Sequence, residues 1–396
     1  MSSVTPQPQR WGAVLAMSLA AFALVASEFM PVSLLTPLAA DLQITEGQAG
    51  QGISVSGVFA LLTSLVIAAV AARMDRKRLL MALTLLMIVS GSVVAFAPNY
   101  AVFMLGRALI GVAIGGFWSL SAATAMRLVE PAQVPRALAI VNGGNALAMV
   151  IAAPLGSFLG GLIGWRGAFF CVVPVAVIAL AWLWLSLPAL KHSGTAATGN
   201  ALRLLKNSKV ALGMCAVSLF FMGQFMLFTY LRPFLEGVTR VEVSTLSLML
   251  LVLGLAGLAG TVLIEHLLKR HLYPTLIAIP LIMAGIALAL VGFGGSAIVT
   301  TLLLGCWGLV ATAAPVGWWT WLARTLPDDA EAGGGLMVAI IQLAIAAGAT
   351  VGGAAFDLSG YQAPFELSAA LLVVATLLAY LASRRPAHAS MASGTT

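Results

Sequence analysis

Apolar runs long enough to cross a lipid bilayer recur along the whole chain. Hydrophobic residues make up 61% of the 396 residues and charged residues only 8%, and the mean hydropathy is +1.04. The core of a soluble domain cannot absorb so many apolar residues, whereas a bilayer with a hydrocarbon core of roughly 30 Å requires helices of about 20 such residues. The sequence therefore predicts a membrane protein that crosses the bilayer many times.

Turn signals between the apolar runs divide the chain into twelve predicted membrane helices. Twelve crossings leave little of the chain for a soluble domain, so we expect an all-α membrane protein in contact with lipid over most of its surface. The expected ranges are about 12–36, 48–72, 78–97, 101–126, 134–162, 167–188, 209–235, 244–266, 272–293, 297–323, 333–356 and 364–383.

The net charge of +7 comes from Lys and Arg residues in short loops between the predicted helices. If the helices alternate in direction, most of these cations lie on one side of the membrane and most acids on the other. An excess of Lys and Arg is typical of cytoplasmic loops, so we expect both termini to be cytoplasmic. Because the rule for cytoplasmic loops accounts for the net charge, we expect no nucleic acid as a partner.

The chain divides into two related halves at a polar, basic stretch, residues 191–208. Glu-Phe-Met at 28–30 recurs as Gln-Phe-Met at 224–226, and the same offset of 196 residues relates Pro37 to Pro233. We expect duplicated six-helix halves, an arrangement in which transporters bind substrate near the membrane midplane. The expected organisation is an N-terminal tail (1–10), a first half (11–190), a central loop (191–208), a second half (209–384) and a C-terminal tail (385–396).

Two charges, Glu28 and Arg107, lie deep inside predicted helices. Glu28 is about eight residues, roughly 12 Å, from the outer end of the first helix, and Arg107 is about six residues, roughly 10 Å, from the outer end of the fourth. Ionisable groups at membrane depth are costly and usually mark a substrate or proton pathway. The matched depths predict a proton-coupling pair; the alternatives are a fixed ion pair or, for Arg107, a bond to helix ends.

Several polar and aromatic residues are candidates for binding a solute. Gln224 occupies the position equivalent to Glu28, and Phe225 and Phe228 flank it on the same helix. An amide beside aromatic rings can hydrogen-bond and stack a flat heterocycle, although Phe residues at such spacing more often pack against lipid or a neighbouring helix. Further polar candidates for the substrate site, besides Glu28 itself, are Asn142, Asn145 and Gln342.

Glycine and proline mark the fifth predicted helix. Gly156 and Gly160 would let another helix approach closely, and Pro154 removes a backbone hydrogen bond and permits a bend. Such a helix is more often a packing element than a binding one. In the tenth predicted helix Trp318, Trp319 and Trp321 lie within about one turn of the inner end, so we expect them to anchor it at the membrane interface.

Motifs of ATP-driven pumps and of common membrane enzymes are absent. The sequence contains no phosphate-binding loop, no H-E-x-x-H and no nucleophile elbow. The three cysteines lie inside apolar runs without metal or disulfide spacing. We therefore expect a protein that is not an enzyme and uses no metal or cofactor.

Three segments resemble motifs of the major facilitator superfamily in its drug–proton antiporter branch. They are L-G-R-A-L-I-G-V-A-I-G-G (105–116), A-P-L-G-S-F-L-G-G (153–161) and A-A-R-M-D-R-K-R (71–78). The resemblance implies a secondary transporter in which Pro154, Gly156 and Gly160 form the antiporter motif. It also implies gating roles for Arg73, Asp75 and Arg76.

Longer stretches are similar to a family of bacterial exporters of purine ribonucleosides. These stretches include E-F-M-P-V-S-L-L-T-P-L-A-A-D-L (28–42) and A-P-V-G-W-W-T-W (314–321). The similarity implies a monomeric inner-membrane protein that exports inosine- or guanosine-like nucleosides in exchange for protons. The alternatives are efflux of sugars or multiple drugs by the same fold, a passive facilitator, or a membrane sensor. The buried Glu28 favours coupling, because a passive facilitator needs no buried acid.

Overall fold

Helices account for every regular element in the computed structural model, which describes residues 10–71, 74–190, 201–327 and 329–385. In the first half the elements are α1 (Trp11–Leu42), α2 (Glu46–Ala71), α3 (Arg76–Ala95), α4 (Tyr100–Met126), η1 (Pro131–Gln133), α5 (Val134–Phe170) and α6 (Val172–Ser186). In the second half they are η2 (Ala201–Lys206), α7 (Ser208–Thr229), α8 (Leu231–Phe234), η3 (Leu235–Thr239), α9 (Val243–Phe293), α10 (Ala297–Ala311), α11 (Ala314–Thr325), α12 (Ala330–Ser359) and α13 (Gln362–Arg384).

These elements form twelve membrane crossings. Eleven of the described segments are long and apolar enough to span a bilayer, and one of them, Pro131–Ser186, is 56 residues long. Gly164 divides that segment, because its φ of 74° leaves the helical region and turns the chain back. His271, with φ −131° and ψ 47°, likewise separates the two crossings within α9. The predicted twelve-helix architecture is confirmed, although the basic turn expected at 267–271 remains helical as far as this bend.

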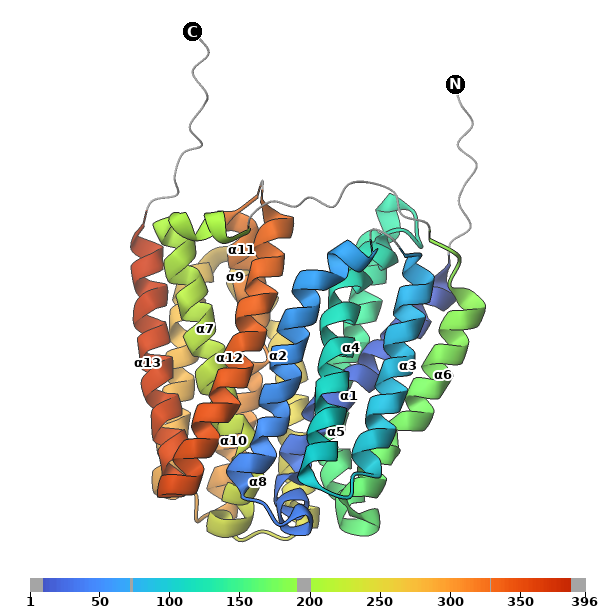
Figure 1. The fold of residues 1–396 in the computed structure, drawn as a ribbon. Coiled ribbons are helices and arrows are strands. Elements are labelled where there is room, and N and C mark those ends of the chain that lie inside the picture. Colours follow the sequence, from blue (N-terminus) through green and yellow to red (C-terminus); the bar gives the residue numbers. More distant parts are fainter. Residues whose placement is uncertain (1–9, 72–73, 191–200, 328, 386–396) are drawn as a thin grey trace, which may run out of the picture.

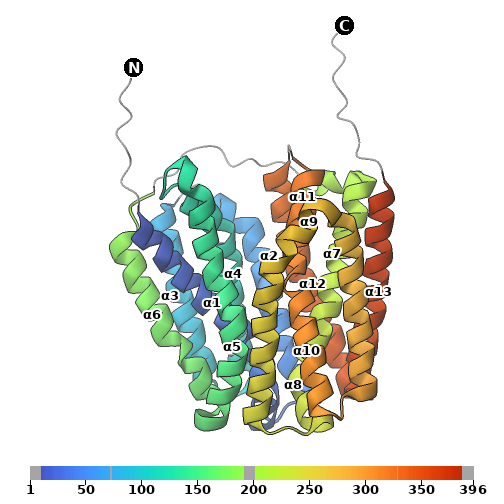
Figure 2. The same ribbon diagram turned by 180° about the vertical axis from the view of Figure 1, so that it is seen from behind.

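The twelve crossings form two bundles that lie side by side (Figures 1 and 2). Elements α1–α6 make one bundle and α7–α13 the other, and α2 and α12 adjoin across the middle. The start of α1 and the end of α13 lie at the same face (Figure 1); we call this the terminal face and the opposite one the distal face. The residue limits expected for the halves, tails and central loop stay predictions.

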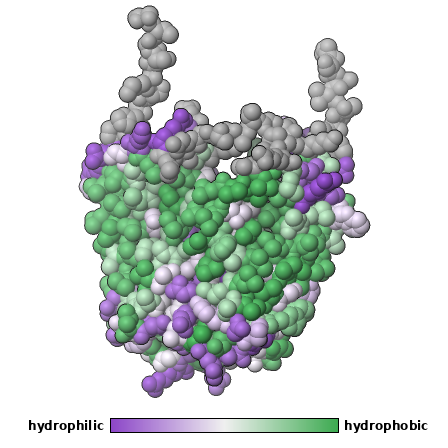
Figure 3. Space-filling view, viewed as in Figure 1, coloured by the Kyte–Doolittle hydropathy of each residue, from purple (hydrophilic) through white to green (hydrophobic). Residues whose placement is uncertain are grey.

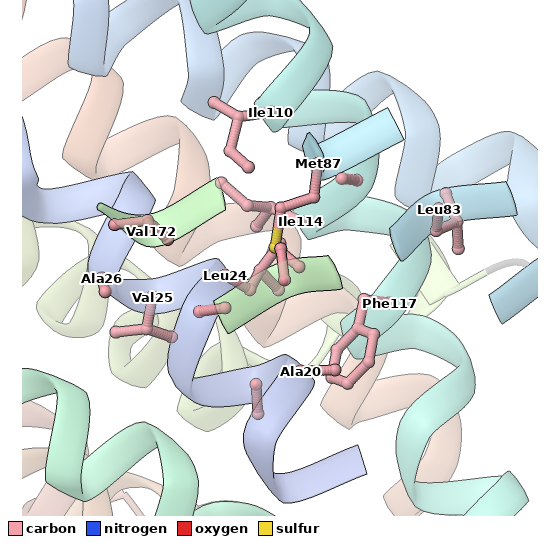
Figure 4. Close-up of a cluster of buried hydrophobic side chains, with 14 of the residues drawn as sticks. Ala20, Leu24, Val25, Ala26, Leu83, Met87, Ile110, Ile114, Phe117 and Val172 are labelled. Carbon is pink, nitrogen blue, oxygen red and sulfur yellow. The ribbon is translucent and has the colours of Figure 1, made fainter. Parts of the chain in front are cut away.

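Each bundle has a core of its own. In the first, Leu24 of α1, Met87 of α3 and Phe117 of α4 are at most 3% exposed and pack together (Figure 4). The second core is built mainly from α7, α9 and α10–α13. Large apolar side chains also point outward, for example Leu185 (77% exposed), and the surface carries a wide apolar belt between two polar ends (Figure 3). Such a surface is stable only in lipid, which fits a protein that crosses the membrane many times.

Two of the three tryptophans of the tenth crossing do not anchor the interface. Trp318 and Trp321 are 2% and 1% exposed, and their rings pack edge to face with centroids 5.9 Å apart. Trp319 is 42% exposed and is the one that can reach the interface. The expectation was wrong for the other two because α11 packs them into the second core, where Gly213 leaves room for the Trp321 ring.

Candidate functional site

Glu28 lies where the two bundles meet. It is 6% exposed in the middle of α1, and the Gln342 side chain of α12 lies close to its carboxyl. Glu28 belongs to the first half and Gln342 to the second. Glu28 and Gln342 were separate candidates in the sequence, and the structure brings them together. A change of charge at the carboxyl therefore affects a contact between the two halves.

Arg107 is fully buried, and it bonds to backbone rather than to the Glu28 carboxyl. Its guanidinium donates to the carbonyls of Ser27 (2.8 Å), Glu28 (2.8 Å) and Gly52 (3.0 Å), and also to the Ser56 hydroxyl (3.1 Å). Among the described residues, no ion pair within 4.0 Å joins Arg107 to Glu28. Arg107 therefore connects α4 to the middle of α1 and to α2. Its acceptors lie inside these helices and not at helix ends, and its part in proton coupling stays a prediction.

The aromatic residues around Gln224 meet their symmetry counterpart. The rings of Phe29 and Phe225, equivalent positions of the two halves, stack with centroids 5.4 Å apart and an interplanar angle of 27°. Phe228 meets Phe225 edge to face at 6.0 Å. This cluster lies at the junction of α1 and α7. Phe29 directly follows Glu28 in the sequence, and Phe225 directly follows Gln224.

A cavity opens beside these rings between α5, α7, α9 and the C-terminal part of α10. Gln224, Phe225 and Phe228 line one side, and the remaining lining residues are Ala146, Met149, Val150, Leu253, Gly254, Leu258, Thr261, Trp307, Gly308, Ala311 and Thr312. The cavity has a volume of about 40 Å³. Sites that enclose drug-sized ligands are about 300–1,000 Å³, so the helices must separate further to admit a nucleoside.

Gln224 presents an unused hydrogen-bonding group at this cavity. Its Oε1 atom is buried and has no hydrogen-bond partner in the described part of the chain. Buried polar atoms are rarely left unpaired, because each costs about 1–3 kcal/mol. An oxygen of this kind on a cavity wall is positioned to accept a hydrogen bond from a ligand.

The two asparagines of α5 lie away from the cavity lining. The Asn142 side chain is exposed, and its amide donates to the Leu138 carbonyl of its own helix (2.9 Å). Asn145 is half-buried and precedes the lining residue Ala146. In the state described here, neither joins Gln224 and the phenylalanines.

The glycines of α5 set its distance from α1. A Cβ atom at Gly156 would lie 2.7 Å from the Ser33 hydroxyl oxygen, and one at Gly160 would overlap the Leu34 side chain. Pro154 is buried between them and the polar start of α5. The observed contacts are those of a packing face, and they hold α5 directly against the helix that carries Glu28.

In the basic turn between α2 and α3, Asp75 has a local structural partner. Its carboxylate accepts the Lys77 backbone N–H (2.8 Å) and so caps the start of α3. Arg76 follows as the first helical residue, with its backbone N–H donated to the Leu190 carbonyl (3.3 Å). Arg73 lies outside the described residues. The gating roles of all three stay predictions.

At the distal face the halves are held together by contacts that the sequence did not suggest. Asp357, in the last turn of α12, accepts hydrogen bonds from the Thr45 hydroxyl (2.6 Å) and the Gly47 backbone N–H (3.0 Å). Within the second half, the Tyr230 hydroxyl donates to the Ala349 carbonyl (2.7 Å) and lies against Gly50 of the first half. A Cβ atom at Gly50 of α2 or Gly353 of α12 would overlap that hydroxyl. Asp357 carried a usable signal, because a carboxylate at a helix C-terminus is unfavourable unless it has a partner.

The same side holds the other bonds between the halves. Arg232 donates to the Ser33 carbonyl and pairs with Glu236 (2.8 Å), and the Ser54 hydroxyl donates to the Ala346 carbonyl (2.9 Å). These bonds between the halves all lie between the distal face and the level of Glu28. The structure is therefore closed at its distal face.

A model of the Major Facilitator Superfamily matches residues 17–348. The chain belongs to this superfamily. This major facilitator protein is therefore a secondary transporter of small molecules, not an enzyme, as the sequence predicted.

Two curated relatives match nearly the whole transporter. "Transcription regulatory protein OpdE" of Pseudomonas aeruginosa is 61% identical over 387 residues, covering 97% of this chain and 96% of the relative. "Purine ribonucleoside efflux pump NepI" of Escherichia coli strain K12 is 42% identical over 368 residues, covering 93% of each. Among solved structures, a bacterial homologue of the human lysosomal transporter Spinster, in an inward-facing and unoccupied conformation, superposes with a TM-score of 0.76. It is 15% identical over 96% of this chain and 98% of that one, so it supports the fold alone.

Proposed function

We propose that this transporter exports purine ribonucleosides, such as inosine and guanosine, in exchange for protons by alternating access. The observation that carries the proposal is the pairing of two unlike sites at the junction of the halves. Glu28 with Gln342 forms an ionisable site, and Gln224 with Phe225 and Phe228 forms an aromatic, hydrogen-bonding one. The relative named as a purine ribonucleoside efflux pump supports the substrate class.

The chemistry of the second site fits a purine better than a sugar. A purine offers a flat face that can stack on Phe228 and edge groups that can donate to the unpaired Gln224 oxygen. A sugar has hydroxyls but no flat face. The ribose would take the other polar groups of the site, for which Thr261 and Thr312 of the cavity lining and Asn145 are candidates.

In the proposed cycle, proton binding at Glu28 alternates with substrate binding near Gln224. In this proposal the basic terminal face is cytoplasmic, so the closed distal face would be periplasmic and the state described here would be open toward the cytoplasm. Protonation of Glu28 would change how its carboxyl interacts with Gln342 of the other half, and thus favour one arrangement of the halves over the other.

Uptake of labelled inosine into everted membrane vesicles tests this proposal. A gradient with the vesicle interior acidic should drive uptake, and a protonophore should abolish it. Unlabelled guanosine should compete, whereas labelled sugars and cationic dyes serve as comparison substrates. Sugar or dye uptake without inosine uptake would replace the nucleoside proposal by the sugar or multidrug alternative.

The relative named as a transcription regulatory protein suggests a second candidate, a membrane sensor that acts on gene expression. We infer that any such effect would follow from transport, because the described elements are arranged as two transporter bundles around a central cavity. Comparing transcript changes caused by wild type and by a transport-dead Glu28→Gln variant, at equal membrane levels, separates the two. Changes that persist in the variant would favour the sensor.

A further inference from the structure

At the terminal face of the second half, a second cavity gathers three cations. Lys209 lies at the start of α7, Arg270 at the bend within α9, and Arg324 near the end of α11, and all three line a cavity of about 290 Å³. Tyr273 and Thr325 add two hydroxyl groups to the same lining. No carboxylate is among the lining residues that the structure describes.

Among the described residues, no carboxylate lies within ion-pair distance of any of the three cations. The Lys209 ammonium lies 5.6 Å from the centroid of the Tyr273 ring, and Arg324 Nη2 donates to the Leu268 carbonyl (3.2 Å). The three ion pairs found in the described part of the chain involve Arg166, Arg203 and Arg232 instead. Like charges held in one cavity repel each other. An anion bound there would reduce this repulsion and stabilise the folded protein.

An apolar surface leads from the membrane to this cavity. Leu263, Leu267 and Arg270 follow one another at intervals of four and three residues, so they share one face of α9. The two leucines are 59% and 52% exposed on the lipid-facing surface. An acyl chain lying along them would bring its headgroup to the level of Arg270.

We propose that the cavity lined by Lys209, Arg270 and Arg324 binds the phosphate group of an anionic phospholipid from the leaflet at the terminal face. Arginine offers paired N–H donors that match phosphate oxygens, and basic cavities between membrane helices are suited to anionic headgroups. The phosphate chemistry alone would also fit a soluble phosphate. The exposed leucine stripe favours the lipid, because a soluble ion makes no use of it.

Binding is measured on the purified full-length protein in neutral detergent. The melting temperature is followed during separate titrations with phosphatidylglycerol, phosphatidylcholine and inorganic phosphate. Phosphatidylglycerol should raise it at low concentration and phosphatidylcholine should not. A Lys209→Gln, Arg270→Gln, Arg324→Gln triple variant should bind phosphatidylglycerol roughly 100-fold more weakly, from about 5-fold for each cation removed.

A matched triple variant provides the control. Arg78, Lys206 and Arg385 are exposed cations at the same face and outside the cavity, so replacing them with Gln removes equal charge and should leave the affinity within about 5-fold of wild type. A Leu263→Ser, Leu267→Ser variant keeps every cation. It should lose phosphatidylglycerol binding, with no change in its response to inorganic phosphate. This variant also keeps the test decisive if the cationic triple variant does not fold.

Three results would overturn the proposal. Equal losses in the two triple variants would mean attraction to general surface charge. An equal effect of inorganic phosphate would assign the cavity to a soluble anion. Unchanged phosphatidylglycerol binding in the leucine variant would remove the reason for choosing a lipid.

Discussion

Arg107 and Glu28 are neighbours in the first half, yet their side chains bond to different groups. The Arg107 guanidinium donates to three backbone carbonyls and a hydroxyl on α1 and α2. The Glu28 carboxyl faces Gln342 of the other half. The arginine is thus arranged to hold one half together, and the acid is arranged to respond to the position of the other half.

Replacing Arg107 with Lys should therefore lower stability more than it alters coupling. A single ammonium cannot reach all four acceptors, and each buried acceptor left unpaired costs about 1–3 kcal/mol. We expect a markedly lower melting temperature in detergent, with a proton dependence of transport that is retained in the fraction that folds. A variant as stable as wild type that has lost proton dependence would instead make Arg107 a coupling residue.

Replacing Glu28 with Gln should abolish transport driven by a pH gradient and leave exchange of substrate across the membrane. The amide keeps the size of the side chain but cannot bind and release a proton. Counterflow and gradient-driven uptake in vesicles measure the two activities separately. Glu366→Gln, which removes an exposed acid, is the control, and gradient-driven transport by the Glu28 variant would show that the acid is structural.

Changes at Gln224 and Phe228 should affect substrate binding rather than proton coupling. Gln224→Ala removes the accepting oxygen and should weaken nucleoside binding by about 1–3 kcal/mol. Phe228→Leu removes a stacking face and should impair purine nucleosides more than sugars. Phe221→Leu is a matched control, because Phe221 packs against Phe220 and does not line the cavity. Equal losses for nucleosides and sugars would argue against stacking.

Between the elements, α5 approaches α1 closely at the terminal part of the first half. A Cβ atom at Gly144 would overlap the Ser18 carbonyl, and the Ser18 hydroxyl donates to the Ile140 carbonyl (2.7 Å). Close backbone contact of this kind is how helices associate in lipid, where apolar burial gives no net drive. It also explains why α5 contains glycine on the face turned to α1.

Gly144→Ala should therefore force the two helices apart, whereas Gly143→Ala should be tolerated. Nothing lies within 4 Å of a Cβ atom at Gly143, so alanine there should be neutral or stabilising by up to about 1 kcal/mol through helix propensity. Melting temperature and transport are measured for both. Similar behaviour of the adjacent variants would mean that the α1–α5 distance is not set by this contact.

At the scale of the whole molecule, the hydrogen bonds found between the two halves lie on the distal side of Glu28. Asp357 accepts bonds from Thr45 and Gly47, so the C-terminal end of α12 is joined to the N-terminal end of α2. The opposite partial charges of these helix ends make the carboxylate more favourable there than at α12 alone. Alternating access requires this contact to break when the distal face opens.

Asp357→Asn should shift the population toward the distal-open state. The amide loses the charge that is attracted to the N-terminus of α2, while keeping most of the side-chain size. Spin labels at Pro98 and Gly295, exposed positions in distal loops of the two halves, should report longer distances in the variant. Asp329→Asn, whose carboxylate pairs with Arg203 within the second half, should leave the distances unchanged. Unchanged distances in both variants would mean that Asp357 does not hold the distal face closed.

The twelve crossings, the two halves and the burial of Glu28 inside the first helix could be predicted from the sequence alone. Hydropathy and length decide whether a segment crosses a bilayer, and both are local properties that the lipid environment enforces. The role of Gln342, the carbonyl contacts of Arg107 and the burial of Trp318 and Trp321 depended on the tertiary structure. So did the cation-lined cavity and the contacts of Asp357. Each of these depends on which faces of helices far apart in the chain meet, and in lipid that choice is made by shape and hydrogen bonding, which hydropathy does not record.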